Sequence, residues 1–223
     1  MAGESRSFWI WFSVLVIASC MMAVGLVFST INSASAKDDI VPAMADAIVL
    51  ITVGDEGECT GFVSKTTFGE MVLTAGHCAG DVKENQKLTA TDSNGKKYGL
   101  TTVYYDAIHD LAVMFPSREK QPSASLKLAC NVPVHIGDDV TMTGFPLDFN
   151  KVTVSGKIAA EPSAWGLWPL VYRVAMFAAP GNSGSAVLNS NGDVIGILVG
   201  GRPDWPGMSM VEPISVICQP GIA

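Results

Sequence analysis

Short runs of β-branched and apolar residues recur along most of the chain, about ten residues apart. Turn residues separate them, most clearly at Ser93–Gly95, Ile136–Asp139 and Ser190–Asp193. No long stretch has the period of an amphipathic helix, so the pattern predicts an all-β barrel or sandwich. Only residues 212–218 are expected to form a short helix. The expected strands are 47–53, 71–74, 100–105, 111–115, 140–143, 152–154, 171–174, 186–188 and 194–199.

The pattern changes at the N-terminus, where residues 8–28 carry no charged side chain. Such a run predicts a membrane helix or an export signal, since its backbone polar groups must satisfy one another in lipid. Ala34 and Ala36 have the spacing of a signal-peptidase site. Residues 1–36 are therefore expected to be a cleaved signal peptide or a transmembrane anchor. A third interpretation is a lipoprotein box with Cys20 as the lipid-bearing residue. All three place residues 37–223 outside the cytoplasm.

Composition narrows the function classes. The chain has 223 residues, 48% hydrophobic and 16% charged, which is typical of a globular protein. Its net charge of −7 argues against binding to nucleic acid, because phosphate contacts need a basic surface. The cysteines after residue 36 are even in number, which predicts two disulfides in an oxidising compartment, with three pairings open. No metal-ligand spacing is present, so neither a metal nor a cofactor is expected. These cysteines are Cys59, Cys78, Cys130 and Cys218.

Three segments carry residues with catalytic chemistry. His77 follows the apolar run 73–75 and has the position of a general base at a strand end. Asp110 directly precedes an apolar run, where a carboxylate can orient an imidazole. Ser183 lies among small residues, which expose its hydroxyl on a tight turn. The N–H groups of Gly181 and Ser183 are candidates for stabilising an oxyanion.

Together these segments resemble the chymotrypsin-like (trypsin-like) serine peptidases, whose His, Asp, Ser order they share. The resemblance covers residues 47–217. Residues 144–146 and 154–158 are similar to the HtrA/DegP type, and residues 181–185 to the glutamyl-endopeptidase type. The resemblance implies two six-stranded antiparallel Greek-key β-barrels, near residues 40–120 and 121–223, with no PDZ module. The segments that carry it are 59–63, 73–78, 109–113, 180–187 and 192–201.

The resemblance also implies residue roles. Ser183 would be the nucleophile, His77 the general base and Asp110 the residue that orients it. A disulfide would join Cys59 to Cys78, which leaves Cys130 and Cys218 for the second. His109 and His135 lack such a context and are expected to be solvated loop residues. The wall of the substrate pocket is expected at Phe177, Val199, Gly200 and Gly201.

Two departures from the family pattern bear on specificity and activation. Asn182 stands before Ser183 where digestive relatives have an Asp, so no activation by a new N-terminus is expected. Phe177 stands where Lys/Arg specificity would need an Asp, which favours cleavage after small or apolar residues. The sequence thus predicts an exported serine endopeptidase acting on proteins or peptides, with a membrane contact through residues 8–28 if they are retained. The alternative is an inactive homologue that serves as a binding module. The oligomeric state stays open.

Overall fold

The computed structural model describes residues 45–53, 56–80, 87–117, 124–148 and 150–218. All of them belong to one compact unit, Pro42–Ala223. The expected signal or anchor at 1–36, with Cys20, lies outside the described residues. Within those ranges, no helix has both the length and the apolar character needed to cross a bilayer.

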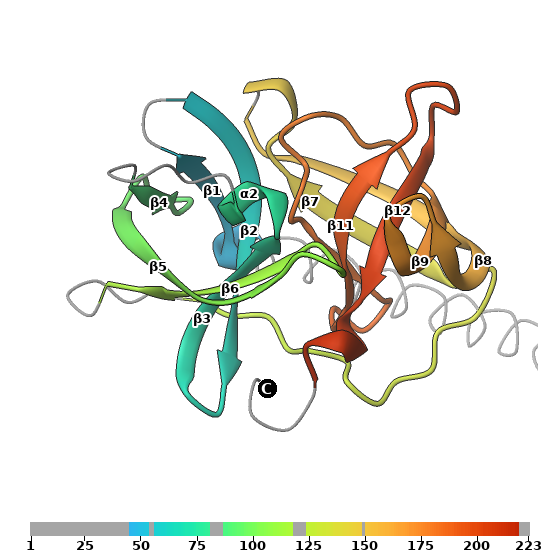
Figure 1. Cartoon of the computed structure of the whole chain (residues 1–223), viewed down its shortest axis with the longest axis horizontal. Coiled ribbons are helices and arrows are strands. Elements are labelled where there is room, and N and C mark those ends of the chain that lie inside the picture. The colour runs from blue at the N-terminus through green and yellow to red at the C-terminus, as the bar shows by residue number, and fades with distance from the viewer. Residues whose placement is uncertain (1–44, 54–55, 81–86, 118–123, 149, 219–223) are drawn as a thin grey trace, which may run out of the picture. The chain divides into compact units, whose positions relative to one another are not determined.

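The strands form two closed antiparallel barrels (Figure 1). The neighbour order in the first barrel is β1-β2-β3-β6-β5-β4, and β4 closes the barrel against β1. Residues after Gly76 leave the barrel as a short helix, α2 (His77–Gly80). The strands are β1 (Ile48–Val53), β2 (Glu56–Thr66), β3 (Gly69–Ala75), β4 (Leu88–Thr91), β5 (Lys97–Asp106) and β6 (Leu111–Pro116).

The second barrel follows the same plan with the order β10-β11-β12-β9-β8-β7, and β7 closes it against β10. A 3-10 turn, η1 (Pro146–Asp148), follows β7. The predicted fold of two six-stranded barrels is confirmed. The strands are β7 (Asp139–Gly144), β8 (Val152–Trp165), β9 (Trp168–Ala175), β10 (Ala186–Leu188), β11 (Val194–Gly201) and β12 (Met208–Pro213).

The C-terminal helix is shorter than the sequence suggested. Residues up to Pro213 extend β12, which pairs with β11 from Gly196↔Pro213 to Gly201↔Ser209. The helix is limited to a 3-10 turn, η2 (Ile214–Val216). Residues 209–213 pair with β11 along the sheet, so the sheet competes successfully with the helix there.

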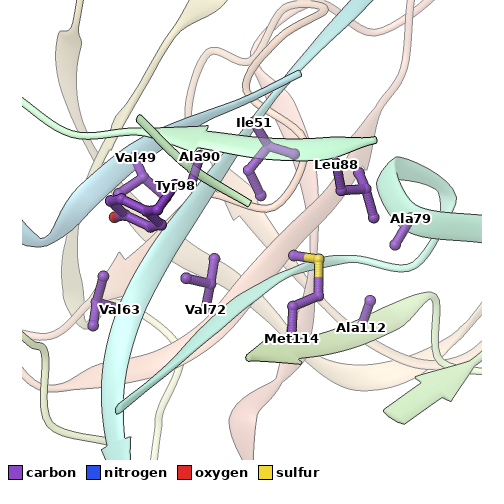
Figure 2. Close-up of a cluster of buried hydrophobic side chains, with 10 residues drawn as sticks. All are labelled: Val49, Ile51, Val63, Val72, Ala79, Leu88, Ala90, Tyr98, Ala112 and Met114. Atoms are coloured by element: carbon purple, nitrogen blue, oxygen red, sulfur yellow. The ribbon is translucent and has the colours of Figure 1, made fainter. Parts of the chain in front are cut away.

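Alternating apolar residues fill the first barrel. In β1, Val49 and Ile51 point inward, as the two-residue period of a strand requires. Every strand of the first barrel, β1 to β6, and α2 contribute side chains to this cluster, and Figure 2 shows them converging on one interior. Met114 is fully buried, and truncating such a side chain to Ala typically costs about 2–5 kcal/mol. The cluster comprises Val49, Ile51, Val63, Val72, Ala79, Leu88, Ala90, Tyr98, Ala112 and Met114.

A separate apolar cluster joins the two barrels. Ala75 and Cys78 contribute to it from the first barrel, and Val171, Val199 and Met210 from the second. Burial of this shared surface holds the end of β3 against β9, β11 and β12. The catalytic candidate His77 follows directly after β3, so this contact places it at the junction of the two barrels.

Two disulfides reinforce this arrangement. Cys59 on β2 is joined to Cys78 on α2, and Cys130 is joined to Cys218 near the C-terminus. The pairing is the one that the family resemblance implies. The first bridge ties α2 to the adjacent strand, and the second ties the end of the chain to the segment between the barrels.

Candidate active site

A close approach of two backbones places His77 at the end of β3. Gly76 N–H donates to the carbonyl oxygen of Asp110 at 2.7 Å. A Cβ on Gly76 would lie 2.8 Å from the backbone nitrogen of Leu111, so only glycine fits without a shift. This hydrogen bond therefore holds the corner after β3 against the start of β6. The two catalytic candidates lie here: His77 directly follows Gly76, and Asp110 is the residue whose carbonyl accepts the bond.

His77 and Asp110 make two hydrogen bonds. The backbone N–H of His77 donates to Oδ1 at 2.7 Å, and Nδ1 lies 2.8 Å from Oδ2. The Asp110 side chain is 15% exposed and the His77 side chain 46%, so the carboxylate is shielded while the ring is open to solvent. With Nδ1 donating to the carboxylate, Nε2 is left as a proton acceptor. Asp110 adopts φ of +53°, and this uncommon conformation at a candidate site is typical of functional strain.

A second Asp–His pair orders the turn before Asp110. Asp106 Oδ1 accepts the backbone N–H groups of Ile108 and His109, while His109 Nδ1 lies 2.7 Å from Asp106 Oδ2. Burial alone would raise the pKa of the Asp106 carboxyl, but these hydrogen bonds outweigh it and the net shift is downward. His109 was expected to be solvated; instead it is held by Asp106. His135 is exposed, as expected.

The loop with Ser183 belongs to the second barrel but is bound to the first. Thr60 N–H donates to the carbonyl oxygen of Ser183 at 2.8 Å, and Cys78 Sγ lies 3.8 Å from the same oxygen. Gly184 N–H donates to Leu198 on β11 at 2.7 Å. Because Cys78 directly follows His77, the His77 and Ser183 segments meet at this point.

Hydrogen bonds also fix the peptide planes around Gly181. Leu147 N–H donates to the carbonyl oxygen of Pro180 at 2.9 Å, and Thr60 Oγ1 donates to that of Gly181 at 2.7 Å. Thr60 Oγ1 in turn accepts the N–H of Phe145 at 3.0 Å. In a trans peptide the N–H points opposite to the carbonyl, so the Gly181 N–H is directed away from Leu147. Leu147 has φ of +52°, a strained conformation beside the candidate oxyanion hole.

A cavity of about 600 Å³ opens beside Ser183. Phe177, Gly200 and Gly201, three of the four residues proposed from the sequence for the substrate pocket, line this cavity. Val199 is buried in the cluster between the barrels. Most of the lining is apolar, which suits an uncharged substrate side chain. The full set is Leu147, Phe177, Ala178, Ala179, Pro180, Ser183, Leu198, Gly200, Gly201, Arg202, Pro203, Pro206, Gly207 and Met208.

Comparison with known proteins identifies the family. The model of the trypsin-like peptidase domain matches residues 59–197. The chain belongs to the trypsin-like peptidase domain family. The predicted resemblance is therefore confirmed, and the match spans the segments of His77, Asp110 and Ser183.

Relatives and solved structures place this trypsin-like domain near the HtrA type. The chain is 26% identical over 160 residues to "Serine protease HtrA-like" of Staphylococcus aureus strains USA300 and NCTC 8325, covering 66% of this chain. It spans only 20% of the length of these relatives. A serine endoprotease from Yersinia pestis shares the fold, with a TM-score of 0.67, 22% identity, and coverage of 81% of this chain and 63% of that one. An inactive form of Rv3671c from M. tuberculosis has a TM-score of 0.63, 25% identity, and coverage of 78% and 84%.

The pocket of this trypsin-like domain contains a cation that the sequence did not reveal. Arg202 lies in the lining, where it pairs with Asp204 through both Nε and Nη2. Its guanidinium carbon also lies 5.0 Å from the ring centroid of Trp165. The Pro- and Gly-rich run 202–207 signals a turn, but only the fold reveals that this turn faces Ser183.

Two further observations concern residues close to the triad candidates. Cys59, His77 and Cys78 lie within metal-ligand distance of one another, but both sulfurs are in the disulfide and cannot act as thiolate ligands. Thr60 was known only as part of a family motif. The structure gives it two hydrogen bonds to the Ser183 loop, one to the carbonyl of Gly181 and one to that of Ser183, and the residue is fully buried.

Proposed function

We propose that this domain is a serine endopeptidase that hydrolyses peptide bonds through Ser183, His77 and Asp110. The observation that carries the proposal is the double hydrogen bond between His77 and Asp110, next to the point where Thr60 and Cys78 contact Ser183. That arrangement suits a general base with a fixed tautomer beside a nucleophile. Family membership supports the same chemistry.

In the proposed reaction, Ser183 Oγ attacks the substrate carbonyl carbon and His77 Nε2 takes the hydroxyl proton. Asp110 keeps Nδ1 protonated and stabilises the imidazolium that forms. The N–H groups of Gly181 and Ser183 stabilise the oxyanion of the tetrahedral intermediate. His77 then gives its proton to the leaving amine, and water hydrolyses the acyl-enzyme by the reverse sequence.

The substrate is proposed to be a protein or peptide with a small or apolar residue before the scissile bond. The cavity beside Ser183 is mainly apolar, and its one cation is paired with Asp204. A basic side chain would find no free acidic partner among the described lining residues. The end of β11 at Gly200 and Gly201 is proposed to pair with the substrate backbone. Two disulfides and the apolar N-terminal run support an extracytoplasmic location.

Replacing Gly201 with Val is expected to narrow the pocket. A Cβ at this position would point between Met208 and Ala178, with its nearest atoms 3.8 and 3.9 Å away, so it fits without distorting the backbone. The larger side chain should lower kcat/KM about tenfold or more for substrates with Phe or Leu before the cleaved bond, and less for Ala. The readout is kcat/KM for matched peptides. Gly99→Val is the control, because Gly99 lies on β5 with no atom within 4 Å of its Cβ. Equal losses for all substrates would argue against this pocket.

Covalent labelling of Ser183 tests the proposed function itself. The full chain, with its disulfides formed, is treated with a fluorophosphonate, and the modified peptide is identified by mass spectrometry. We expect one adduct on Ser183, lost in Ser183→Ala and strongly slowed in His77→Ala. A folded protein that gives no adduct would contradict the proposal and favour the alternative of an inactive binding module.

A further inference from the structure

Glu212 occupies the contact between the two barrels. On β12 its neighbour Val211 points into the core of the second barrel, while Met210 belongs to the cluster between the barrels. Side chains alternate along a strand, so Glu212 shares the face of Met210 and points toward the first barrel. Its partner on β11 is Ile197, which is fully buried.

The Glu212 carboxyl is buried without a hydrogen-bond partner. The residue is 0% exposed, and neither Oε1 nor Oε2 has a partner within the described part of the chain. An ionised carboxylate in such a place would be very costly, and even a neutral polar group is rarely left unpaired. A buried carboxyl without a hydrogen-bond partner is therefore unusual at the contact between two barrels, and its protonation state affects the stability of that contact.

The charges that act on Glu212 come from the first barrel. Asp106 and Asp110 both act on it electrostatically, and each is bound to its histidine, His109 and His77 respectively. Burial, reinforced by these two carboxylates, raises the pKa of Glu212 to about 8.

In the described part of the second barrel, no charge compensates for the burial of Glu212. On β9, the Arg173 guanidinium is directed to Ser163 Oγ at 3.0 Å and to the Trp165 ring. Neither β11 nor η2 has a charged residue in its sequence. The protonated carboxyl is thus the form that the interface accommodates, and Asp110 is the catalytic candidate that acts on it electrostatically.

We propose that Glu212 is a positioning residue that must stay protonated to keep the His77–Asp110 pair in place, and that loss of its proton switches the site off. The inference rests on the proposed function. On ionisation the proton leaves to solvent, and a third carboxylate charge appears in the interface beside Asp106 and Asp110. Repulsion then acts on the Asp110 carboxylate and on the packing of β12 against the first barrel.

Two variants of the full chain test this inference. Glu212→Gln keeps the shape of the protonated side chain and cannot ionise, while Glu212→Met keeps its length without polar atoms. The rate of fluorophosphonate labelling at Ser183 is measured from pH 6 to pH 10. At pH 9 a group with a pKa of about 8 is roughly ten-to-one ionised, so the wild-type rate should fall to about a tenth of its maximum and recover at pH 7. The variants should keep their rate at pH 9. Identical pH profiles in wild type and variants would overturn the inference.

A second readout separates this inference from the proposed function. Folding keeps Glu212 protonated from its ordinary pKa of 4.5 up to about 8, so wild-type stability should fall relative to Glu212→Gln across that window and then level off. Thermal midpoints measured against pH do not require activity. Suppose that the wild type is never labelled at Ser183 but that its thermal midpoint falls with pH relative to that of Glu212→Gln. This result would contradict the peptidase proposal and would still support a buried, protonated Glu212. Parallel midpoints in wild type and Glu212→Gln would overturn the inference. A Glu212 carboxyl carbon that titrates near 4.5 by NMR in the wild type would overturn it even if neither variant folds.

Discussion

Asp110→Asn is expected to lower kcat/KM for peptide hydrolysis by about 10⁴, a loss of the size that this exchange causes in a serine peptidase with an established triad. The Oδ1 position accepts the backbone N–H of His77 at 2.7 Å, so the amide oxygen of Asn should take that place. The amide NH2 group would then face Nδ1, which lies 2.8 Å from Oδ2 in the wild type. A donor there makes Nδ1 the acceptor and puts the ring proton on Nε2, which can no longer accept a proton from Ser183.

The chain offers a matched control in Asp106→Asn. Asp106 holds His109 by the same two contacts, one to the backbone N–H and one to Nδ1, but its histidine lies outside the proposed triad. We expect this control to lose less than about tenfold in kcat/KM, through loosening of the turn before Asp110. Both variants are assayed for peptide hydrolysis and for folding by circular dichroism. Similar losses in two folded variants would mean that Asp110 acts through the turn and not through His77.

The sequence pattern was sufficient for most of the fold because short runs of apolar and β-branched residues, bounded by turn residues, mark the strands of a barrel wall. The apolar runs at β1, β6 and β11 were all expected as strands and all lie in barrel walls. The strand β2 was not in that set, since Glu56–Thr66 mixes charged and small residues with apolar ones. Gly61 lies in its middle, where a Cβ would come within 2.5 Å of the side chain of Ile51. In the local sequence, a glycine argues against a strand. In the barrel, the absence of a Cβ at Gly61 leaves room for the side chain of Ile51 on the neighbouring strand.

A different cause explains the error at β12. Residues 212–218 were expected to be helical, yet Glu212 and Pro213 end a strand. Met and Glu have weak strand preference, so the local signal was ambiguous. Pairing with β11 and β9 decides the outcome, and that contact lies outside any local window.

Candidate chemistry was easier to find than the residues that support it. The segments with His77, Asp110 and Ser183 have recognisable neighbours in sequence. The roles of Thr60, Arg202 and Glu212 depend on contacts between the barrels or across the pocket. Thr60, for example, donates to Gly181, which is 121 residues away. Such contacts exist only after both barrels close, so no sequence pattern predicts them.

Gly184→Ala is expected to destabilise the protein by about 3 kcal/mol or more. Gly184 has φ of +86°, which strains any residue with a Cβ. In addition, a Cβ there would overlap Thr74 Oγ1 and the carbonyl oxygen of Thr60 and would lie 2.9 Å from Ala75 N. Thr74 Oγ1 donates to Thr60 at 2.7 Å, so relief of the overlap would break a buried hydrogen bond. The thermal midpoint should drop by roughly 10 °C, and Ser183 labelling should slow at temperatures where the variant is folded.

Gly95→Ala separates the two causes of this loss. Gly95 also has positive φ, +75°, but no atom lies within 4 Å of its Cβ. In Gly95→Ala only the backbone strain applies, so we expect the free energy of unfolding to fall by about 1 kcal/mol. The rate of Ser183 labelling should not change. If Gly184→Ala and Gly95→Ala proved equally stable, the Ser183 loop would not be packed against Thr60 and Thr74 as described. If Gly184→Ala lost stability but labelled at the wild-type rate, that packing would stabilise the barrels without positioning the nucleophile.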